Sequence, residues 1–257
     1  IHDEALLIET ITANPSTKLI HLETPANPTL QCVDIQAICT IAKAHGIKVS
    51  VDNTVATPYL QQPFALGADF VFHSATKFLN GHGSALHGVM LGKDLEFMNK
   101  KAWKWHALMG GNSNAFDAYL LIQGMKTLEI RMDRHCSNTE KVAQFLDNHP
   151  AIEKVNYTGL AAHPDHAIAK KQMKQHAPLI SFELKGGLDA GKKFIDALED
   201  ANLKQIVYPT SNFCKKIFLY YFSHKISLLG VTLTMIMYHQ CLKKTRNSST
   251  FATTKKV

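Results

Sequence analysis

An apolar run at residues 68–72 is followed by two hydroxyl residues, Ser74 and Thr76, and then by a lysine, Lys77. The run is typical of a buried strand, so we expect these polar side chains where the strand gives way to a loop. Ligands of parallel α/β sheets bind at such strand ends. A lysine amine there can react with a carbonyl group, while hydroxyls and backbone N–H groups hold a phosphate. On its own the stretch is a weak signal, because most lysines are solvated surface charges.

Two more polar residues follow neighbouring predicted strands. Asp52 comes directly after the strand expected at residues 47–51, and Asn27 lies in a proline-bounded loop after the strand expected at residues 18–23. Helices are predicted between successive strands, and this alternation indicates right-handed parallel crossovers. We therefore expect Asn27, Asp52 and the loop of residues 74–77 at one edge of one sheet.

This set of side chains suits pyridoxal 5'-phosphate. Lys77 would bind the cofactor aldehyde as an imine, and Asp52 would face the pyridine nitrogen and stabilise its protonated form. Asn27 would donate to the phenolic oxygen, and Ser74 and Thr76 would bind the phosphate. Each residue also has a structural interpretation, since Asp and Asn commonly form turns and hydroxyls commonly cap loops.

Other chemistries are less well supported. The histidines near the lysine, His73, His82 and His87, do not have the spacing of a metal-binding helix, and we expect no metal site. A triad of Asp52, His73 and Ser74 would lack the Gly-x-Ser-x-Gly turn of a hydrolase. Residues 80–83 carry two glycines but not the GxGxxG fingerprint of a nicotinamide site.

Charge and composition narrow the function classes. Nine of the 28 Lys and Arg and none of the 21 Asp and Glu lie after residue 200, so the first 200 residues carry a net charge of −2. Because the excess of positive charge is confined to the tail, nucleic-acid binding is not indicated. The apolar runs at residues 217–222 and 226–237 fall short of the ~20 residues that span a bilayer, and we expect no membrane segment. Five widely spaced Cys without a Cys-x-x-Cys pair favour a reducing cytoplasm.

The predicted elements divide the chain into an α/β cofactor domain at residues 1–146 and a smaller α+β domain at residues 147–257. The composition changes at about residue 207, and we assign no fold beyond that point. Apolar periodicity predicts the other elements, which are helices at 1–12, 33–45, 59–66, 114–146 and 189–198 and strands at 87–91, 152–157 and 179–184.

Three stretches around the candidate residues together resemble a known family. They are Glu-Thr-Pro-Ala-Asn-Pro-Thr at 23–29, the run from Val-Asp-Asn-Thr to Pro at 51–63, and His-Ser-Ala-Thr-Lys-Phe-Leu-Asn-Gly-His at 73–82. This combination is similar to the Cys/Met metabolism pyridoxal-phosphate enzymes, which include cystathionine γ-synthase, cystathionine β- and γ-lyases, methionine γ-lyase and O-acetylhomoserine sulfhydrylase. The similarity continues through residues 110–112 and 123–132 to residues 185–187.

The resemblance implies the fold of fold-type I pyridoxal-phosphate-dependent transferases, with Lys77, Asp52, Ser74, Thr76 and Asn27 in the roles given above. It also implies a homo-oligomer, a dimer of dimers in intact relatives, that acts on a small amino acid in transsulfuration. Similarity around residues 110–114 and 156–160 favours γ-elimination on methionine or cystathionine. The alternative is γ-replacement, as in cystathionine γ-synthase or O-acetylhomoserine sulfhydrylase.

The chain also departs from the family pattern at both ends. A phosphate-binding turn, a ring-stacking tyrosine and a Tyr-x-Arg pair would all precede Ile1. Near the other end, residues 227–230 only approximate the family's Ser-Leu-Gly-Gly, and Arg246 lacks the context of the arginine that grips the substrate carboxylate. We therefore expect an N-terminally truncated chain with an atypical C-terminus. A catalytically inactive fragment or subunit remnant is the other interpretation.

Overall fold

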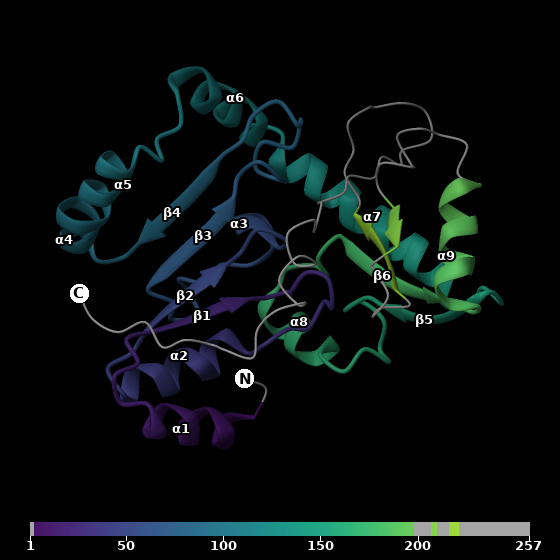
Figure 1. The fold of residues 1–257 in the computed structure, drawn as a ribbon, viewed down its shortest axis with the longest axis horizontal. Coiled ribbons are helices and arrows are strands. Elements are labelled where there is room, and N and C mark those ends of the chain that lie inside the picture. The colour runs from purple at the N-terminus through teal and green to yellow at the C-terminus, as the bar shows by residue number, and fades with distance from the viewer. Residues whose placement is uncertain (1–2, 198–206, 210–215, 221–257) are drawn as a thin grey trace, which may run out of the picture.

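Two four-stranded sheets and the helices around them make up the structure (Figure 1), a computed structural model that describes residues 3–197, 207–209 and 216–220. The first sheet has the order β1 (Leu19–Glu23), β2 (Lys48–Asp52), β3 (Phe70–Ser74) and β4 (Gly88–Gly92). The first three strands are parallel, which confirms the predicted crossovers. Strand β4 instead runs antiparallel to β3, because the segment between them contains no crossover helix.

One face of the first sheet is covered by α1 (Glu4–Ala13) and α2 (Ile35–Ala44). In α2, apolar residues recur at the spacing of one helix face, so that one side packs on β1 and β2; they are Ile35, Ile38, Cys39 and Ala42. The helix begins after Asp34, whose carboxylate accepts the N–H of Ala37 at 3.1 Å. Gly46 follows the helix with a φ of +66°, a conformation that glycine adopts without strain.

The short helix predicted at residues 59–66 is wrong in its bounds. Helix α3 spans Thr57–Leu60, and residues 62–66 form turns in which the N–H groups of Ala65 and Leu66 reach back three residues. Pro63 has no backbone N–H to donate, so it cannot continue the hydrogen-bond pattern of the preceding turn.

After β4 the chain is helical, in α4 (Leu95–Phe97), a π-helical segment (Met98–Ala102), α5 (Trp103–Met109), α6 (Ala115–Met125) and α7 (Leu128–Asp147). The single helix predicted at residues 114–146 is therefore wrong, since α6 and α7 are separate. The break has a local cause. The carbonyl of Gly124 accepts hydrogen bonds from the backbone N–H and the hydroxyl of Thr127, at 3.3 and 3.2 Å, in place of continued helical pairing.

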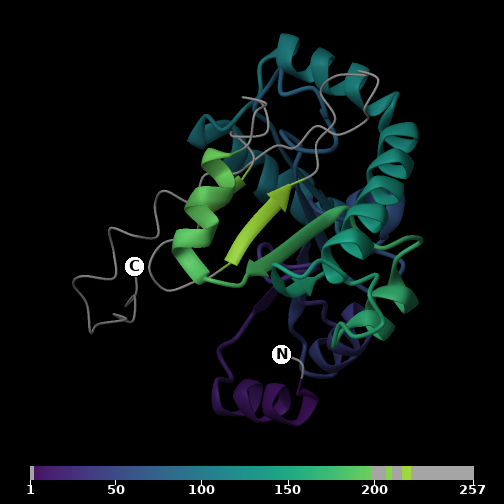
Figure 2. The ribbon, with the colours of Figure 1, turned by 90° about the vertical axis from the view of Figure 1, so that its right-hand side faces the viewer.

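The second sheet is antiparallel and has the order β5 (Ile152–Asn156), β6 (Leu179–Leu184), β8 (Lys216–Tyr220) and β7 (Val207–Pro209). Helices α7 and α9 (Gly187–Asp196), both visible beside this sheet in Figure 2, pack on its strands, and their apolar side chains share one cluster with those of β5 and β6. Helix α8 (His166–Gln172) precedes β6.

The two sheets share α7, because its first half packs on the loops of the first sheet and its second half on β5 and β6. The boundary at residues 146 and 147 remains a prediction. Most of the chain beyond residue 207, including the approximate family motif at residues 227–230 and Arg246, lies outside the described residues. No helix in the described part of the chain is long and apolar enough to cross a membrane.

Candidate active site

The pairing of β1, β2 and β3 gathers the predicted site residues at one edge of the first sheet. Glu23 is in register with Asp52, and Asp52 with Phe72, so the three strands end side by side. Asn27 lies in the loop after β1, Ser74 ends β3, and Thr76 and Lys77 follow in a turn; the expected juxtaposition at the carboxyl ends is therefore present.

Asp52 lies on the face of the sheet that α1 and α2 leave uncovered. Residues paired in register project to the same side of a sheet, so this face also carries His21, Ser50 and Phe72. The Nδ1 atom of His21 lies 2.8 Å from the Ser50 hydroxyl, and its ring meets the edge of Phe72 at a centroid distance of 5.9 Å. The side chains of Leu19 and His21 on this face are exposed, so a ligand can approach Asp52 from this side.

The side chain of Thr54 connects Asp52 to Ser74. Its backbone N–H donates to Oδ1 of Asp52 at 2.9 Å, and its hydroxyl oxygen accepts the backbone N–H of Ser74 at 2.7 Å. The turn-forming interpretation of Asp52 is thus present in the structure, but it occupies one oxygen. Oδ2 accepts no hydrogen bond from the described part of the chain. Sequence reasoning did not select Thr54, although its position directly after a strand end was a usable signal.

A second carboxylate, Glu23, stands beside Asp52 and was not predicted as a site residue. Its Oε1 accepts the backbone N–H of Asn27 at 3.0 Å, which holds the loop that carries the Asn27 side chain. Burial raises the pKa of Glu23, the hydrogen bond from Asn27 lowers it, and the neighbouring Asp52 carboxylate raises it further. Repulsion of this kind favours a cationic group, or a proton, near the pair.

Lys77 is half-buried in a tight turn. Its backbone N–H donates to the carbonyl of Ser74 at 3.1 Å, and its own carbonyl accepts the N–H of Gly81 at 2.7 Å. No acidic side chain among residues 3–197 forms an ion pair with it. Burial lowers the pKa of the Lys77 amine, so its neutral, nucleophilic form is more accessible than in a solvated lysine.

The two hydroxyls proposed for phosphate differ in their partners. The Thr76 hydroxyl donates to the carbonyl of His87 at 3.2 Å and accepts the backbone N–H of His87 at 2.8 Å. Its proton is therefore directed at the start of β4. The Ser74 hydroxyl has no hydrogen bond within the described residues, so Ser74 is the better placed of the two to donate to an anion.

The three histidines near Lys77 serve the local structure. His73 is buried, and strand alternation puts it on the face opposite Asp52. Nδ1 of His82 lies 2.6 Å from the carbonyl of Asn80, and Nδ1 of His87 lies 2.7 Å from the hydroxyl of Ser113. No group of three or more His, Cys, Asp or Glu that could hold a metal ion is present in the part of the chain that the structure describes.

The residues at this edge fit pyridoxal phosphate. Among the described residues, the Lys77 amine has no counter-ion, Oδ2 of Asp52 accepts no hydrogen bond and the Ser74 hydroxyl has no partner; Asp52 and Ser74 end adjacent strands, and Lys77 follows three residues after Ser74. Comparison with known proteins agrees with this chemistry, because the family model for "Cys/Met metabolism PLP-dependent enzyme" matches residues 4–206. The chain belongs to this family.

Relatives within the Cys/Met metabolism family include lyases and a synthase. The chain is 50% identical over 190 residues to L-methionine gamma-lyase of Porphyromonas gingivalis, a match that covers 74% of this chain and 48% of that protein. It is 43% identical over 194 residues to cystathionine beta-lyase of Coxiella burnetii, covering 76% and 50%. Cystathionine gamma synthase of Xanthomonas oryzae pv. oryzae, solved with aminoacrylate and cysteine, superposes with a TM-score of 0.74 at 37% identity and covers 77% and 50%.

These matches confirm the predicted fold class, that of the α/β pyridoxal-phosphate enzymes of fold type I, and the predicted cofactor class of the family. The chain spans about half the length of the curated relatives that it matches.

Proposed function

We propose that the protein is a pyridoxal-phosphate-dependent enzyme of transsulfuration that catalyses γ-elimination on methionine or cystathionine. One observation carries the proposal. The half-buried Lys77 follows the end of β3, beside the end of β2 where Oδ2 of Asp52 accepts no hydrogen bond from the described residues, in a chain whose family is pyridoxal-phosphate-dependent.

Each residue has a distinct part in this proposal. Lys77 would bind the cofactor, and its amine in the neutral form would take the proton from Cα of the substrate. The lowered pKa of Lys77 supports both roles, because each requires an uncharged amine. When bound, the cofactor supplies an electron sink for the charge that develops at Cα.

The remaining side chains hold the cofactor. Asp52 would face the pyridine nitrogen with Oδ2, which accepts no hydrogen bond from the described residues, and Ser74 would donate to the phosphate. Thr76 reaches the phosphate only if its hydroxyl turns away from His87. Asn27 would donate to the ring oxygen from a loop that its backbone hydrogen bond to Glu23 holds.

The γ-elimination assignment rests on the match to methionine gamma-lyase. The second candidate is γ-replacement, which the likeness to cystathionine gamma synthase favours. Product analysis separates the two reactions. Elimination from methionine releases methanethiol, ammonia and 2-oxobutanoate, whereas replacement at Cγ with an added thiol gives a new thioether amino acid and no 2-oxo acid.

The decisive experiment locates the cofactor. Purified protein is mixed with pyridoxal phosphate, reduced with borohydride and digested, and the modified peptide is identified by mass spectrometry. We expect stoichiometric modification at Lys77, loss of it in Lys77→Ala, and no change in Lys104→Ala, which removes an exposed lysine of α5. Modification scattered over surface lysines and unchanged in Lys77→Ala would instead identify the chain as a non-catalytic remnant.

We also propose that the protein is a homo-oligomer, a tetramer by analogy with intact relatives. Support comes from exposed apolar side chains on α5, α6 and the start of α7, which we term the α5–α6 surface: Trp103, Trp105, Leu108, Met109, Phe116, Tyr119, Ile122 and Ile130. Monomers seldom leave such a set uncovered. Light scattering after size exclusion should show a smaller mass for Phe116→Glu than for Leu6→Glu, a matched change on exposed α1. Equal masses would contradict a subunit interface at the α5–α6 surface.

Cytoplasmic location is likewise proposed, and it is supported by the free thiols of Cys32, Cys39 and Cys136. The partner that we propose is a small amino-acid substrate, and we expect neither nucleic acid nor membrane as a partner.

A further inference from the structure

The guanidinium of Arg131, in the first turn of α7, contacts the turn that carries Lys77. Its Nη1 donates to the carbonyl of Phe78 at 2.7 Å, and its Nη2 lies 3.4 Å from the carbonyl of Leu79. Phe78 and Leu79 directly follow Lys77, so Arg131 holds the backbone of the residues next to the candidate catalytic amine.

The same guanidinium also reaches the end of α6. Nη2 donates to the carbonyl of Gly124 at 2.8 Å, and Nε donates to the hydroxyl of Thr127 at 3.0 Å. Carbonyl oxygens at a helix C-terminus carry partial negative charge, which a cation stabilises. Arg131 thus ties together the Lys77 turn, the end of α6 and the start of α7.

Two glycines make this close approach feasible. A Cβ at Gly81, which has a φ of +68°, would lie 2.0 Å from Nη1 of Arg131. A Cβ at Gly124 would lie 2.1 Å from the carbonyl oxygen of Asn80. The turn, the guanidinium and α6 therefore meet only because side chains are missing at these positions.

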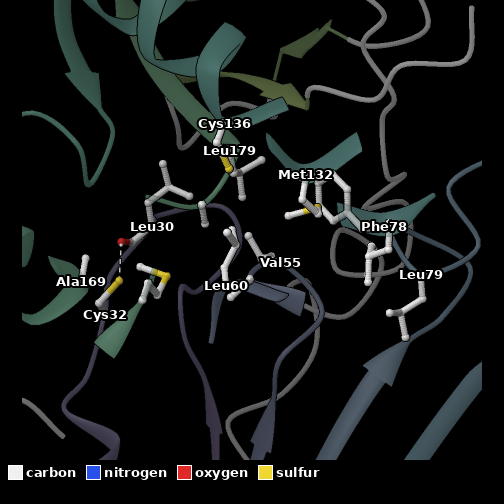
Figure 3. Packing of buried hydrophobic residues seen from close by; sticks show 14 of the residues in the cluster. Leu30, Cys32, Val55, Leu60, Phe78, Leu79, Met132, Cys136, Ala169 and Leu179 are labelled. Atoms are coloured by element: carbon white, nitrogen blue, oxygen red, sulfur yellow. Dashed lines mark hydrogen bonds between the residues drawn. The ribbon is translucent and has the colours of Figure 1, made fainter. Parts of the chain in front are cut away.

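Apolar packing also joins the Lys77 turn to α7. Phe78 and Leu79 are buried together with Leu128 and Met132 of α7, and Figure 3 shows Phe78, Leu79 and Met132 at one end of this cluster. The guanidinium has no carboxylate partner within the described residues, and burial lowers its pKa to about 10. Within the described residues, three carbonyl groups and the Thr127 hydroxyl, and no carboxylate, therefore solvate its charge.

We propose that Arg131 is a positioning residue that fixes the backbone after Lys77 and so holds the Lys77 amine in the geometry that cofactor binding requires. The effect on cofactor binding rests on the proposed function. The contacts of the Arg131 guanidinium with the Lys77 turn and with α6, which we term the Arg131 clamp, can be tested without cofactor. A lysine cannot replace this arginine, because one ammonium lacks the fork geometry with which the guanidinium reaches the carbonyls of Phe78, Leu79 and Gly124 and the hydroxyl of Thr127.

The first measurement is amide hydrogen exchange of the protein without cofactor. The N–H groups of Asn80 and Gly81 close the turn, as they donate to the carbonyls of Ala75 and Lys77 at 2.9 and 2.7 Å. We expect Arg131→Lys to raise their exchange rates by about tenfold or more, since the turn opens more often. The matched control is Arg134→Lys, an exposed arginine of the same helix, which should leave them unchanged.

A second pair of variants displaces the guanidinium without removing it. Gly81→Ala places a methyl group against Arg131, whereas Gly46→Ala imposes the same positive-φ strain at +66° with no atom within 4 Å. We expect faster exchange at Asn80 only in Gly81→Ala. This pair keeps the inference testable if Arg131→Lys fails to fold.

The second measurement is the rate of borohydride trapping of pyridoxal phosphate on Lys77, at temperatures equally far below each variant's melting point. We expect a loss of about tenfold to a hundredfold in Arg131→Lys and Gly81→Ala and none in the controls. The positioning role would be overturned if amide exchange at Asn80 and Gly81 were unchanged in both variants, or if the rate of borohydride trapping at Lys77 were unchanged. If the wild-type protein traps no cofactor, the proposed function fails, and turn exchange alone then decides whether the clamp exists.

Discussion

The hydroxyl oxygen of Thr54 accepts the backbone N–H of Ser74 at 2.7 Å, while the N–H of Thr54 donates to Asp52. Thr54 therefore sets the distance between the carboxylate and the serine on neighbouring strand ends. A residue outside the predicted set thus couples the groups proposed for the two ends of the cofactor, its ring nitrogen and its phosphate.

Replacement of Thr54 should affect both stability and cofactor attachment. Thr54→Val keeps the shape but leaves the Ser74 N–H without an acceptor, which should lower the free energy of unfolding by about 1–2 kcal/mol. Urea denaturation measures this change, and labelling at Lys77 should fall with it. Thr54→Ser should behave like the wild type, and so should Thr40→Val on the exposed side of α2. Equal stability of Thr54→Val and wild type would show that the hydrogen bond contributes nothing.

The lowered pKa of Lys77 predicts a pH dependence of its reactivity. Burial disfavours the charged amine, so Lys77 loses its proton at lower pH than a lysine with the ordinary value of 10.5. Reductive methylation followed by peptide mass spectrometry should therefore reach half its maximal rate at lower pH in the folded protein than in a synthetic peptide of residues 74–80. Coincident profiles would contradict the effect of burial.

The same shift has a consequence for stability. Between the folded pKa of Lys77 and 10.5, the unfolded chain binds more protons than the folded one, so stability rises with pH across this window. Below the window the folded protein carries the full cost of a charged, buried amine. Lys77→Met should accordingly be more stable than wild type at neutral pH, and the difference should shrink as the pH approaches 10.5.

His135 predicts a loss of stability in mild acid. Burial, and secondarily the charge of Arg131, lowers its pKa to about 4, whereas the unfolded value is 6.5. The unfolded chain takes up the proton first as pH falls, so stability decreases from pH 6.5 down to about 4. This loss amounts to about 3 kcal/mol at most.

His135→Met should remove that part of the acid sensitivity, which urea melts at pH 7 and pH 4.5 would show. The matched control is His45→Met, at an exposed position after α2, which should keep the wild-type difference between the two pH values. The same acid response in His135→Met and wild type would rule out His135 as its source.

Replacing the buried polar side chain of Gln61 should strongly lower the free energy of unfolding. Its buried amide donates to the carbonyl of Thr24 at 2.8 Å and to Oδ1 of Asn53 at 2.9 Å, and its Oε1 accepts from Gln172 of α8 at 3.0 Å. Gln61→Leu leaves these buried partners unsatisfied and should destabilise the protein by about 2–4 kcal/mol in urea melts. Gln62→Leu, at the exposed neighbouring position, serves as the control. A cost below that of the control would show that water replaces the lost bonds.

The strands of the first sheet and the helices between them could be predicted, because the sequence patterns that indicate them are local. The strand ends that carry Asp52 and Ser74, and the cap of α2 at Asp34, follow from apolar alternation, helical spacing and capping chemistry over a few residues. Their common edge follows from the strand-helix-strand order, since such crossovers are parallel. The errors at residues 59–66 and 114–146 arose where turns and side-chain hydrogen bonds interrupt an apolar pattern that periodicity alone extends.

By itself, the sequence determined the candidate chemistry: an amine and two hydroxyls after one strand, a carboxylate after another, and the family motifs around them. Only the tertiary structure decided how these groups are held. Thr54 reaches Ser74 across 20 residues, Arg131 reaches Phe78 across 53, and Gln172 reaches Gln61 across 111. Such contacts carry no local signal, because they depend on how distant backbone segments approach once the core has packed, and so on glycines and buried polar partners far apart in the chain.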